Sequence, residues 1–426
     1  MTRSRYLPCA LLAAALCVAC SDDDKANRPC DAEPIVMKTA AGVEFVRTPA
    51  ACFASLADWP YASKTVEIDG LRQAYVDEGK ADGPVVLLLH GQPSWSYLYR
   101  KMIPLLADAG NRVIAMDHLG MGRSDKPTQI ADYSYTGHAQ RLEQFIEKLG
   151  LKDITLFCQD WGSLIGLRVA GLHPEWFARI AVGDGTLPVV PAGITVYPEV
   201  NDPDTVDETL TSPFTAVPEQ QPPFYDEKCN LIVPQSGGGF AAWMTYAMKA
   251  SAFRPSEVLE ALTWFPLTPE VEKAYDAPFP SRIYLAGARV FPSLINQLPG
   301  ANAQAWEGLK AFERPFLTIW AANDASNLGQ CETQDNLICA VKGAAGQAHA
   351  RLDKASHFLQ DDQGAEIARR LVDFLKGTVA AAEYNPLCAP PVAADGTGTP
   401  CSKDADCAAL AAKKCLATGS IGICTV

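Results

Sequence analysis

Residues 154–167 read Ile154-Thr155-Leu156-Phe157-Cys158-Gln159-Asp160-Trp161-Gly162-Ser163-Leu164-Ile165-Gly166-Leu167. The first five form a short apolar run, which is typical of a buried strand, and the last four open an apolar helical stretch. The small residues after Asp160 permit a strained turn that exposes its side chain above a sheet. Because Asp is also a favoured N-terminal helix cap, this stretch alone leaves Asp160 as either a nucleophile or a cap.

Similar apolar runs recur along the chain and are separated by helical stretches. They lie at 85–89, 113–115, 180–182, 316–320 and 349–352, and a last helix is expected from about 362 to 377. Short buried strands that alternate with helices predict an α/β fold with a mostly parallel sheet covered by helices. The alternation lapses between 187 and 300, where prolines and aromatic residues accumulate, so this segment is expected to be an inserted helical cap.

These changes divide the chain into six segments. They are an export signal (1–20), an N-terminal extension or linker (21–60), the first part of the core (61–186), the cap (187–300), the second part of the core (301–378) and a Cys-rich tail (379–426). The tail has few large apolar residues, so disulfides would have to hold it in place.

The charge of the chain argues against a nucleic-acid partner. Its 426 residues include 36 Lys and Arg against 49 Asp and Glu, which gives a formal net charge of −13. No basic cluster stands out that could follow a phosphate backbone.

The N-terminus has the layout of an export signal. Arg3 and Arg5 precede the apolar run 11–16, which is too short to span a bilayer. The segment that ends at Cys20 resembles a bacterial lipoprotein box with Cys20 as the lipidated residue, although Cys17 stands where an aliphatic residue is usual. A plain secretory signal is the alternative. Either signal takes the protein out of the cytosol, and a lipid on Cys20 would also anchor it to a membrane.

The 14 cysteines fit an oxidising compartment. Cys30 and Cys52 flank the N-terminal extension, and Cys331 and Cys339 are expected in one loop. Five more crowd the tail: Cys388, Cys401, Cys407, Cys415 and Cys424. Outside the export signal there is no C-x-x-C pair with a nearby His, so disulfides are expected rather than zinc, with no pairing assigned. Cys158, in an apolar strand, is expected to be a free thiol.

Partners for Asp160 occur in the order nucleophile, acid, histidine. Asp324 follows the apolar run 316–320 and His357 precedes the last helix, so both are expected at the carboxyl ends of strands. The other histidines have structural explanations or lack an acid at the expected place; His90 is expected to brace a loop. We therefore predict Asp160 as the nucleophile, His357 as the base and Asp324 as the acid that orients His357.

A carboxylate nucleophile selects a particular chemistry. With an ordinary pKa of about 3.9, an Asp is ionised at neutral pH and needs no base to activate it. Its natural target is a saturated carbon with a leaving group, which gives an alkyl-enzyme ester. His357 is then free to activate water against this ester. Alkyl halides and epoxides suit these steps, whereas amides and ordinary esters suit them poorly.

The leaving group separates these two substrate classes. A departing halide needs N–H donors, which Trp161 beside the nucleophile and Trp243 in the cap offer, although core packing alone could explain Trp243. An epoxide oxygen must instead be protonated. Four cap tyrosines are candidates for this: Tyr197, Tyr225, Tyr246 and Tyr275. The tryptophan pair favours a halide.

Several motifs together resemble the haloalkane dehalogenases of the α/β-hydrolase superfamily. They are His90-Gly91-Gln92-Pro93-Ser94-Trp95-Ser96-Tyr97-Leu98-Tyr99-Arg100, the stretch from Asp117 to Pro127, Gln159-Asp160-Trp161-Gly162, and the cap segments 239–243, 277–281 and 286–292. The similarity runs from about residue 61 to 378. It implies an α/β-hydrolase fold with an inserted helical cap, a catalytic set of Asp160, His357 and Asp324, and a halide site of Trp161 and Trp243. It also implies the subfamily whose second halide-binding Trp lies early in the cap.

Two residues depart from the family pattern. Gln92 stands where this subfamily often has Glu and its sister groups have Asn. The resemblance implies that the backbone N–H groups of Gln92 and Trp161 serve an oxyanion site, and that the Gln92 side chain lies near the halide or water. Ser163 replaces a frequent Gly and is expected to crowd the turn slightly.

The predicted reaction converts a haloalkane and water to an alcohol and halide, so no metal or organic cofactor is expected. The protein is predicted to be a monomer, either anchored to a membrane or secreted. An epoxide hydrolase, which shares the fold and the Asp and His, remains the nearest alternative. A surface-anchored binding protein on a non-catalytic hydrolase scaffold is the second alternative.

Overall fold

The computed structural model describes most of the chain. The described residues are 28–214, 225, 239–324, 326–378, 381–388, 400–401, 414–418 and 421–425. The predicted export signal with Cys20 lies outside these ranges, as do parts of the cap and the tail.

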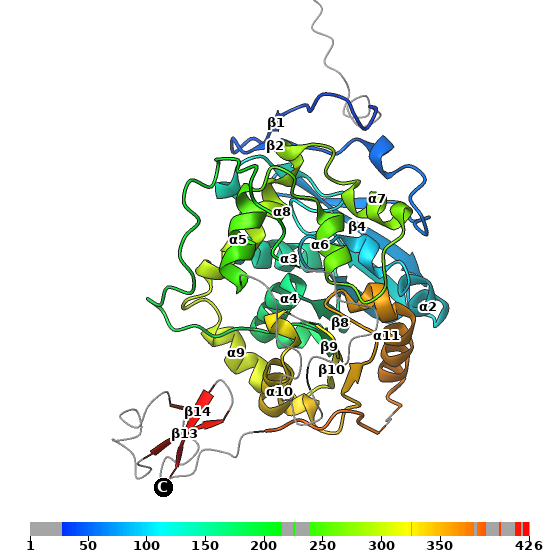
Figure 1. Ribbon diagram of the computed structural model, residues 1–426. Coiled ribbons are helices and arrows are strands. Elements are labelled where there is room, and N and C mark those ends of the chain that lie inside the picture. Colours follow the sequence, from blue (N-terminus) through cyan, green and yellow to red (C-terminus); the bar gives the residue numbers. More distant parts are fainter. Residues whose placement is uncertain are drawn as a thin grey trace, which may run out of the picture.

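An eight-stranded sheet forms the centre of the core (Figure 1). In spatial order its strands are β11 (Ala350–Leu352), β10 (Phe316–Ala321), β9 (Phe177–Gly183), β8 (Ile154–Gln159), β5 (Val85–Leu89), β6 (Arg112–Met116), β4 (Leu71–Gly79) and β3 (Lys64–Ile68). All neighbours from β11 to β6 are parallel, and β4 pairs antiparallel with both β6 and β3. Parallel strands end at one edge, so the residues that follow β8 to β11 meet there.

The strands expected from apolar runs are all in this sheet, which confirms the mostly parallel α/β architecture. The hairpin of β3 and β4 has no such run, because β3 is largely exposed and β4 mixes apolar residues with polar ones such as Arg72 and Gln73. A signal for it is nevertheless present. Asp69 and Gly70 join the two strands with φ of 51° and 74°, and an Asp-Gly pair is a strong marker of a two-residue hairpin turn.

Helices cover the sheet in two groups. On one side α2 (Ile103–Asp108) packs against α11 (Leu359–Lys376); on the other, α3 (Tyr135–Leu149) packs against α4 (Trp161–Leu172), which in turn packs against α9 (Ala303–Lys310) (Figure 1). The Ser134 hydroxyl caps the start of α3, and Gly150, with φ of 62°, ends it. Helix α10 (Cys331–Ala340) packs on β10. Short 3-10 helices are η1 (Ala50–Phe53), η2 (Ser96–Tyr99), η3 (Ile130–Asp132), η4 (Pro174–Trp176), η5 (Arg282–Leu285), η6 (Phe291–Gln297), η7 (Asn327–Gly329) and η8 (Lys342–Ala344).

The segment between β9 and β10 forms the inserted helical cap. Its helices are α5 (Gly239–Lys249), α6 (Pro255–Ala261), α7 (Pro269–Asp276) and α8 (Ala286–Val290). Proline opens both α6 and α7, where its missing N–H costs nothing. Helix α5 packs against α8, and α6 against α7. In Figure 1 these helices occupy the upper half of the molecule, beyond the end of the sheet.

The described part of the N-terminal extension is a packed arm and not a linker. Its strands β1 (Met37–Lys38) and β2 (Glu44–Val46) join β7 (Lys126–Pro127) in a small sheet. Arg47 forms a two-point ion pair with the buried Asp125, and the Thr48 hydroxyl donates to the backbone oxygen of Pro278 in the cap at 2.7 Å. The arm therefore contacts both core and cap.

Disulfides tie down both peripheral segments. Cys30 bonds to Cys52 in the arm, and Cys339 to Cys388 at the start of the tail. Cys331 is disulfide-bonded as well, and the expected free thiol at Cys158 is confirmed. The expectation that Cys331 and Cys339 share a loop is wrong, since both lie in α10.

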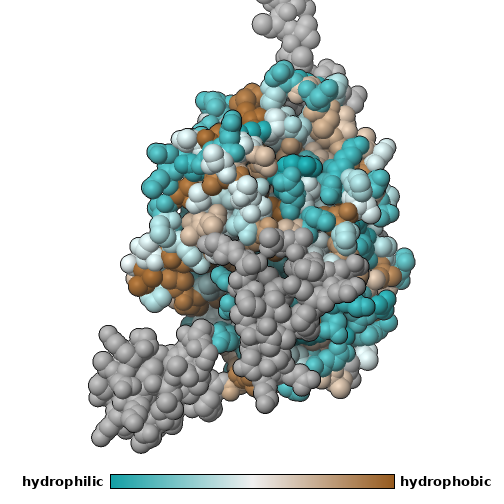
Figure 2. All heavy atoms as spheres, viewed as in Figure 1, coloured by the Kyte–Doolittle hydropathy of each residue, from teal (hydrophilic) through white to brown (hydrophobic). Residues whose placement is uncertain are grey.

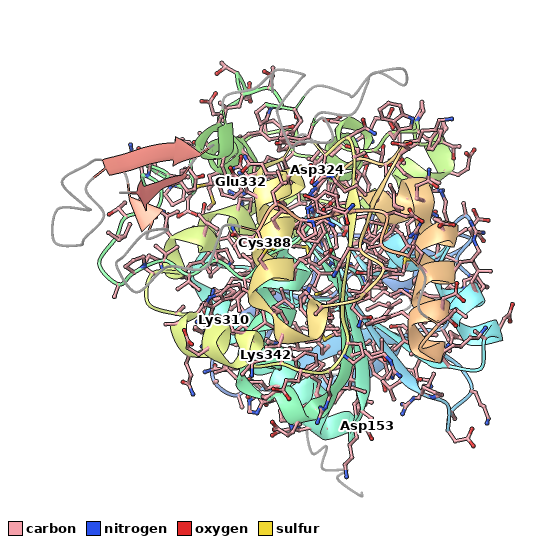
Figure 3. All side chains as sticks on the ribbon, turned by 90° about the horizontal axis from the view of Figure 1, so that it is seen from below. Asp153, Lys310, Asp324, Glu332, Lys342 and Cys388 are labelled. Carbon is pink, nitrogen blue, oxygen red and sulfur yellow. A yellow bond between two sulfur atoms is a disulfide. The ribbon has the colours of Figure 1, made fainter. Side chains whose placement is uncertain are left out.

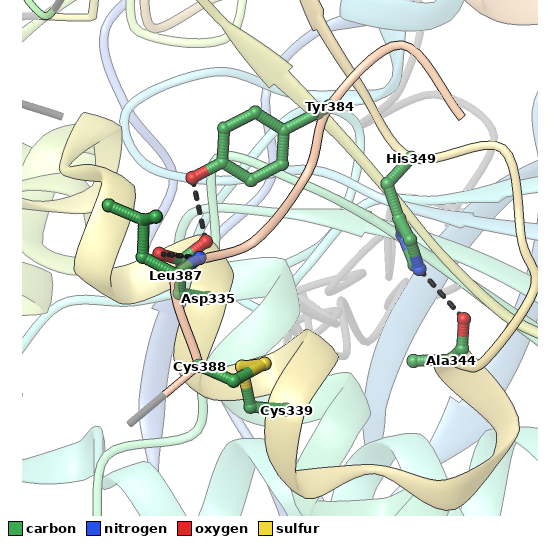
Figure 4. Close-up of a disulfide and its surroundings, with 7 residues drawn as sticks. All are labelled: Asp335, Cys339, Ala344, His349, Tyr384, Leu387 and Cys388. Atoms are coloured by element: carbon green, nitrogen blue, oxygen red, sulfur yellow. Dashed lines mark hydrogen bonds between the residues drawn. A yellow bond between two sulfur atoms is a disulfide. The ribbon is translucent and has the colours of Figure 1, made fainter. Parts of the chain in front are cut away.

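The tail begins with a clasp on α10 (Figure 4). The Asp335 carboxylate accepts hydrogen bonds from the Tyr384 hydroxyl at 2.6 Å and from the backbone N–H of Leu387 at 3.0 Å. Further along lie the strands β12 (Pro400–Cys401), β13 (Lys414–Thr418) and β14 (Ile421–Thr425); β14 pairs antiparallel with each of the other two.

The surface offers no single apolar face in the view of Figure 2, where hydrophobic and hydrophilic residues are interspersed. Among the residues that the structure describes, no helix has both the length and the apolar character needed to cross a membrane.

Candidate active site

Asp160 lies on the turn between β8 and α4, at the edge where the parallel strands end. Its backbone has φ of 51° and ψ of −130°, a conformation that costs free energy for any residue but glycine. Its side chain accepts no hydrogen bond from the first turn of α4. The interpretation of Asp160 as a simple helix cap therefore finds no support in this geometry, whereas a strained strand-to-helix turn is what exposes a nucleophile.

Two glycines make room for this turn. A Cβ on Gly91 would lie 2.3 Å from Asp160 Oδ1, and a Cβ on Gly162 would lie 2.2 Å from the backbone oxygen of Leu89. Both distances are far below van der Waals contact. A side chain at either position would thus displace the Asp160 carboxylate or the turn itself.

The Asp160 carboxylate faces groups from two other loops. The backbone N–H of Gln92 donates to Oδ1 at 2.8 Å, and His357 Nε2 lies 3.5 Å from Oδ2. The side chain of Asp160 is 14% exposed and that of His357 is 5% exposed. A reaction between them would proceed largely shielded from bulk water.

His357 is oriented by Asp324, which lies just beyond the end of β10 at the start of the loop to α10 (Figure 3). His357 Nδ1 lies 2.8 Å from Asp324 Oδ2. The backbone N–H of Ser326 donates to the other oxygen of Asp324 at 2.7 Å, and the Ser326 hydroxyl donates to Oδ2 at 2.9 Å. Nδ1 is therefore the protonated nitrogen of a neutral His357, which leaves Nε2 as its basic atom.

Charges around the ring set the pKa of His357. Burial alone would lower it, but the carboxylates of Asp324 and Asp160 outweigh burial and raise the pKa well above 6.5. Burial would raise the pKa of Asp324, yet His357 and the two donors of Ser326 hold it below 3.8. Asp324 thus stays ionised and stabilises an imidazolium on His357.

Two residues of this site were missed in the sequence. One is Ser326, two positions after Asp324, a spacing at which Asp and Ser commonly form local turn hydrogen bonds. The other is Gln159, fully buried just before the nucleophile. Its amide nitrogen lies 3.2 Å from His357 Nε2 and donates to the backbone oxygen of His357 at 3.0 Å. Gln159 belongs to the motif around the nucleophile, but no local pattern indicates its contact with His357, because that partner is distant in sequence.

Gln92 donates two separate hydrogen bonds, one from its backbone and one from its side chain. Its backbone N–H points at Asp160 Oδ1, as expected of an oxyanion donor. Its side-chain amide donates to the backbone oxygen of Ala288 in α8 at 2.7 Å, so it ties the loop after β5 to the cap. One of the two N–H groups of this amide is thus committed to the cap.

The two tryptophans lie in different aromatic clusters. Trp161 opens α4, is 4% exposed, and packs edge-on against Phe291 of η6 at 5.4 Å between ring centroids. Trp243, on α5, is 6% exposed and packs with Phe214, Tyr246 and Phe253. Helix α5 also packs against η6. Trp161 thus contacts η6, and the helix that carries Trp243 packs against the same element. No ring contact between the two tryptophans is present among the described residues.

Ser163 and His90 hold the loops around Asp160. The Ser163 hydroxyl donates to the backbone oxygen of Asp160 at 2.6 Å and accepts from the backbone N–H of Thr186 at 2.8 Å, so it stabilises the turn it was expected to crowd. His90 Nδ1 donates to the oxygen of Gly91 at 2.8 Å, and its Nε2 accepts from the backbone N–H of His118. Burial lowers the pKa of His90, so this bracing ring stays neutral.

Tyr275, one of the tyrosines considered as an epoxide acid, is engaged elsewhere. It is buried, and its hydroxyl donates to Asp361, which also pairs with Arg100. Tyr246 packs within the cluster of Trp243. The Tyr275 hydroxyl is thus committed to Asp361 and not to donation beside Asp160.

Among the described residues, one group of side chains has the spacing of a metal site. It consists of Asp184, Asp324 and His357, whose ligating atoms lie within 4.8 Å of one another. His357 Nδ1 and Asp324 are already committed to each other at 2.8 Å. The group is therefore best described as a hydrogen-bonded acid and base with a second carboxyl beside them.

Comparison with known proteins gives consistent results. The family described as the alpha/beta hydrolase fold matches residues 84–219. A haloalkane dehalogenase of Mycobacterium marinum is 40% identical over 342 residues, which cover 78% of this chain and 100% of the relative. One of Psychrobacter cryohalolentis is 37% identical over 343 residues, which cover 78% of this chain and 98% of the relative.

Solved structures agree. The tetrameric haloalkane dehalogenase of Paraglaciecola agarilytica NO2 superposes with a TM-score of 0.61 at 29% identity, over 77% of this chain and 97% of that chain. A haloalkane dehalogenase of Bradyrhizobium elkani USDA94 superposes with a TM-score of 0.55 at 23% identity, over 74% of this chain and 98% of that chain. The second likeness bears on the fold alone.

Proposed function

The chain belongs to the haloalkane dehalogenases, hydrolases of the α/β-hydrolase fold that act on carbon–halide bonds, and we propose that it works through a covalent ester on Asp160. One observation carries this mechanism. The Asp160 carboxylate lies on a strained turn, with a backbone N–H at one oxygen and the Nε2 atom of His357 near the other.

In the first step Asp160 displaces the halide. Oδ1 is held by the N–H of Gln92, so Oδ2 is the oxygen free to attack the carbon that bears the halogen. The carbon–halogen bond breaks as the carbon–oxygen bond forms, and the halide leaves with the bonding electrons. N–H donors aimed at the developing charge would stabilise this transition state.

In the second step water cleaves the ester. His357 Nε2 takes a proton from water, the hydroxide attacks Cγ of Asp160, and negative charge develops on Oδ1. The Gln92 N–H, already 2.8 Å from that oxygen, is placed to stabilise it, with the N–H of Trp161 as the second donor. Asp324 stabilises the imidazolium. The carbon–oxygen bond from Cγ to the alkoxide breaks, the imidazolium returns its proton to the alkoxide, and the alcohol leaves. The carboxylic acid of Asp160 then releases its proton to water, which regenerates the carboxylate.

The change in charge between the two steps prepares His357 for its role. In the free enzyme Asp324 and Asp160 together raise the pKa of His357. Esterification removes the charge of Asp160, so the pKa of His357 falls when the ring must act as a base. The charge of Asp160 thus influences whether His357 is protonated in each step.

For the halide we propose the indole N–H groups of Trp161 and Trp243. Both side chains are nearly buried, and their helices α4 and α5 each contact η6 or its residue Phe291. This assignment includes the subfamily with the second tryptophan early in the cap. It rests on the sequence motifs together with this placement.

The activity test uses the purified full chain and a panel of bromoalkanes. Bromide release that is lost in Asp160→Asn, with folding retained by circular dichroism, is the expected result. Styrene oxide is the comparison substrate. Diol formation without bromide release would overturn the proposal in favour of an epoxide hydrolase, and bromide release that survives Asp160→Asn would overturn the nucleophile.

We further propose that the protein is exported and anchored through a lipid on Cys20. The support is the sequence of the first 20 residues and the disulfides, which form in oxidising compartments. Replacing Cys20 by Ala should move the protein from the membrane to the soluble fraction. An unchanged distribution would rule out this anchor.

The protein is proposed to act as a monomer, although one solved relative is tetrameric. Sedimentation velocity of the purified chain distinguishes the two states. A single species near the mass of one chain is expected, which is 45.8 kDa when the export signal is still present.

A further inference from the structure

Asp184 is a buried carboxyl that the reaction described above does not use. It follows β9, whereas Asp160 follows β8, Asp324 follows β10 and His357 follows β11. These four strands are neighbours in the sheet. Asp184 therefore stands between the nucleophile and the acid, at the same edge of the sheet.

The Asp184 side chain has one strong partner and one oxygen without any. It is 0% exposed. Oδ1 accepts from the backbone N–H of Ala321 at 2.9 Å, whereas the buried Oδ2 has no hydrogen-bond partner among the described residues. A buried carboxylate oxygen without a donor is costly, but a protonated one carries no charge and can itself donate.

Asp184 lies close to both members of the acid and base pair. A carboxyl oxygen of Asp184, one of Asp324 and a ring nitrogen of His357 lie within 4.8 Å of one another. Two buried carboxyls at such a distance do not both ionise readily, because like charges repel strongly away from water. One proton held by the pair removes this repulsion.

Hydrogen bonds decide which carboxyl keeps this proton. Asp324 accepts from both donors of Ser326 and from His357, while Asp184 accepts only from Ala321. More donors stabilise the ionised form of Asp324. Burial, and then the charge of Asp324, raise the pKa of Asp184 well above its usual range, against the opposing charges of His357 and of Arg351 on β11.

Resting on the function proposed above, we propose that Asp184 is a positioning residue that carries the proton of this carboxyl pair. It keeps the negative charge on Asp324, beside His357. Asp184 can also substitute for Asp324: when Asp324 is replaced by a neutral residue, Asp184 ionises and stabilises the imidazolium of His357 instead.

A double-mutant cycle on the full chain tests this proposal by bromide release. Asp324→Asn should lower the rate at least about tenfold, since an amide cannot stabilise the imidazolium equally well. Asp184→Asn should cost only a few-fold alone but at least about tenfold more in the Asp324→Asn background. Equal rates for Asp324→Asn and the double variant would overturn the proposal. If the unaltered chain releases no bromide, the proposed function itself fails instead.

Two further readouts exclude a purely structural role. The rate of Asp324→Asn should rise with pH through an ionisation that the double variant lacks, whereas packing defects give no such step. Infrared spectroscopy tests the protonation of Asp184 without a substitution at that residue. At pH 8.5 the unaltered chain should show the carbonyl band of a protonated carboxyl, and Asp324→Asn should lose it. A band that persists in Asp324→Asn would contradict the ionisation of Asp184.

Discussion

His357 is the residue at which the reaction can be stopped halfway. Since Asp160 needs no base to attack, His357→Gln should still form the ester but fail to hydrolyse it. A mass increase equal to the alkyl group of the substrate should appear on the intact protein and persist for minutes. Asp160→Asn, the matched control, should gain no mass. Full turnover by His357→Gln would show that another group activates the water.

The charge of Asp160 should be visible in the titration of His357. Asp160→Asn mimics the uncharged ester, so it should lower the pKa of His357 measured by NMR. Hydrolysis of the ester requires the neutral ring and should therefore slow as the pH falls through this lower pKa. Rapid-quench mass spectrometry should then show ester accumulating at low pH. An unchanged His357 pKa in Asp160→Asn would contradict the coupling between the two groups.

At the residue scale, sequence reasoning proposed Asp160, Asp324 and His357 because each follows an apolar run that ends at one edge of a parallel sheet. The structure places these three side chains together. The sequence alone did not predict that Gln159 and Asp184 lie beside them. Their partners lie on other strands, and only the register of the sheet brings them close.

Helix α5 carries the tryptophan that most needs a test. If the indole N–H of Trp243 holds the halide, Trp243→Phe should weaken halide binding by about tenfold, the cost of one hydrogen bond to a charged group. Bromide quenching of tryptophan fluorescence measures this affinity. Tyr246→Phe, in the same aromatic cluster, is the control and should leave bromide binding unchanged. Equal bromide affinities for Trp243→Phe and the parent chain would show that Trp243 serves packing and does not bind the halide.

Helix α11 connects the cap to the loop of His357 through Asp362. The Asp362 carboxylate accepts from the backbone N–H groups of Trp264 and Phe265 in the cap and from that of Ser356 beside His357. Burial raises its pKa to about 7 despite these three donors. Its contribution to stability is therefore complete below the unfolded pKa of 3.8 and is lost as the pH rises towards about 7.

Asp362→Asn removes this titration. Between pH 4 and 8 the free energy of unfolding of the parent chain should fall by about 1 to 3 kcal/mol relative to the variant, less than the full shift implies because the side chain is partly exposed. Urea unfolding at both pH values measures the difference. Asp373→Asn, at an exposed position of α11, is the control. It keeps Asp362, so its free energy of unfolding should change with pH as that of the parent chain does. A constant difference between parent and Asp362→Asn would refute the assignment.

At the element scale, continuous apolar runs predicted the parallel strands of the sheet. The arm has no such run, so its packing was not predicted. Its buried residues Phe45, Val46 and Trp59 are scattered among polar ones. They become apolar contacts only because β2 pairs with β7 and Trp59 packs edge-on against Trp95 at 5.2 Å. Such contacts depend on tertiary structure, and the hydrophobic periodicity of the sequence does not reveal them.

Across the whole molecule, disulfides fasten the two segments that flank the catalytic core. The Cys30–Cys52 bond spans 22 residues of the arm, and the Cys339–Cys388 bond spans 49 residues between α10 and the tail. Loop closure of these lengths is worth about 3 and about 4 kcal/mol. The composition of the tail indicated that it needs such a bond, but it could not name Cys339 as the partner, because α10 lies beside the tail only in the fold.

The tail clasp should stabilise the enzyme without taking part in its reaction. Its described contacts run to Asp335 and Cys339 of α10, to the His349 backbone and, through Glu383, to Arg370 of α11. None of these contacts involves Asp160 or His357. Ending the chain after Thr378, with Cys339→Ser to remove the unpaired thiol, should lower the Tm by about 4 to 6 °C for a loss near 4 kcal/mol. The rate of bromide release at 25 °C should stay within about twofold. Ending it after Cys388 keeps the clasp and should leave the Tm unchanged. If both truncations lower the Tm equally, the stabilising contacts lie beyond Cys388 and not in the clasp.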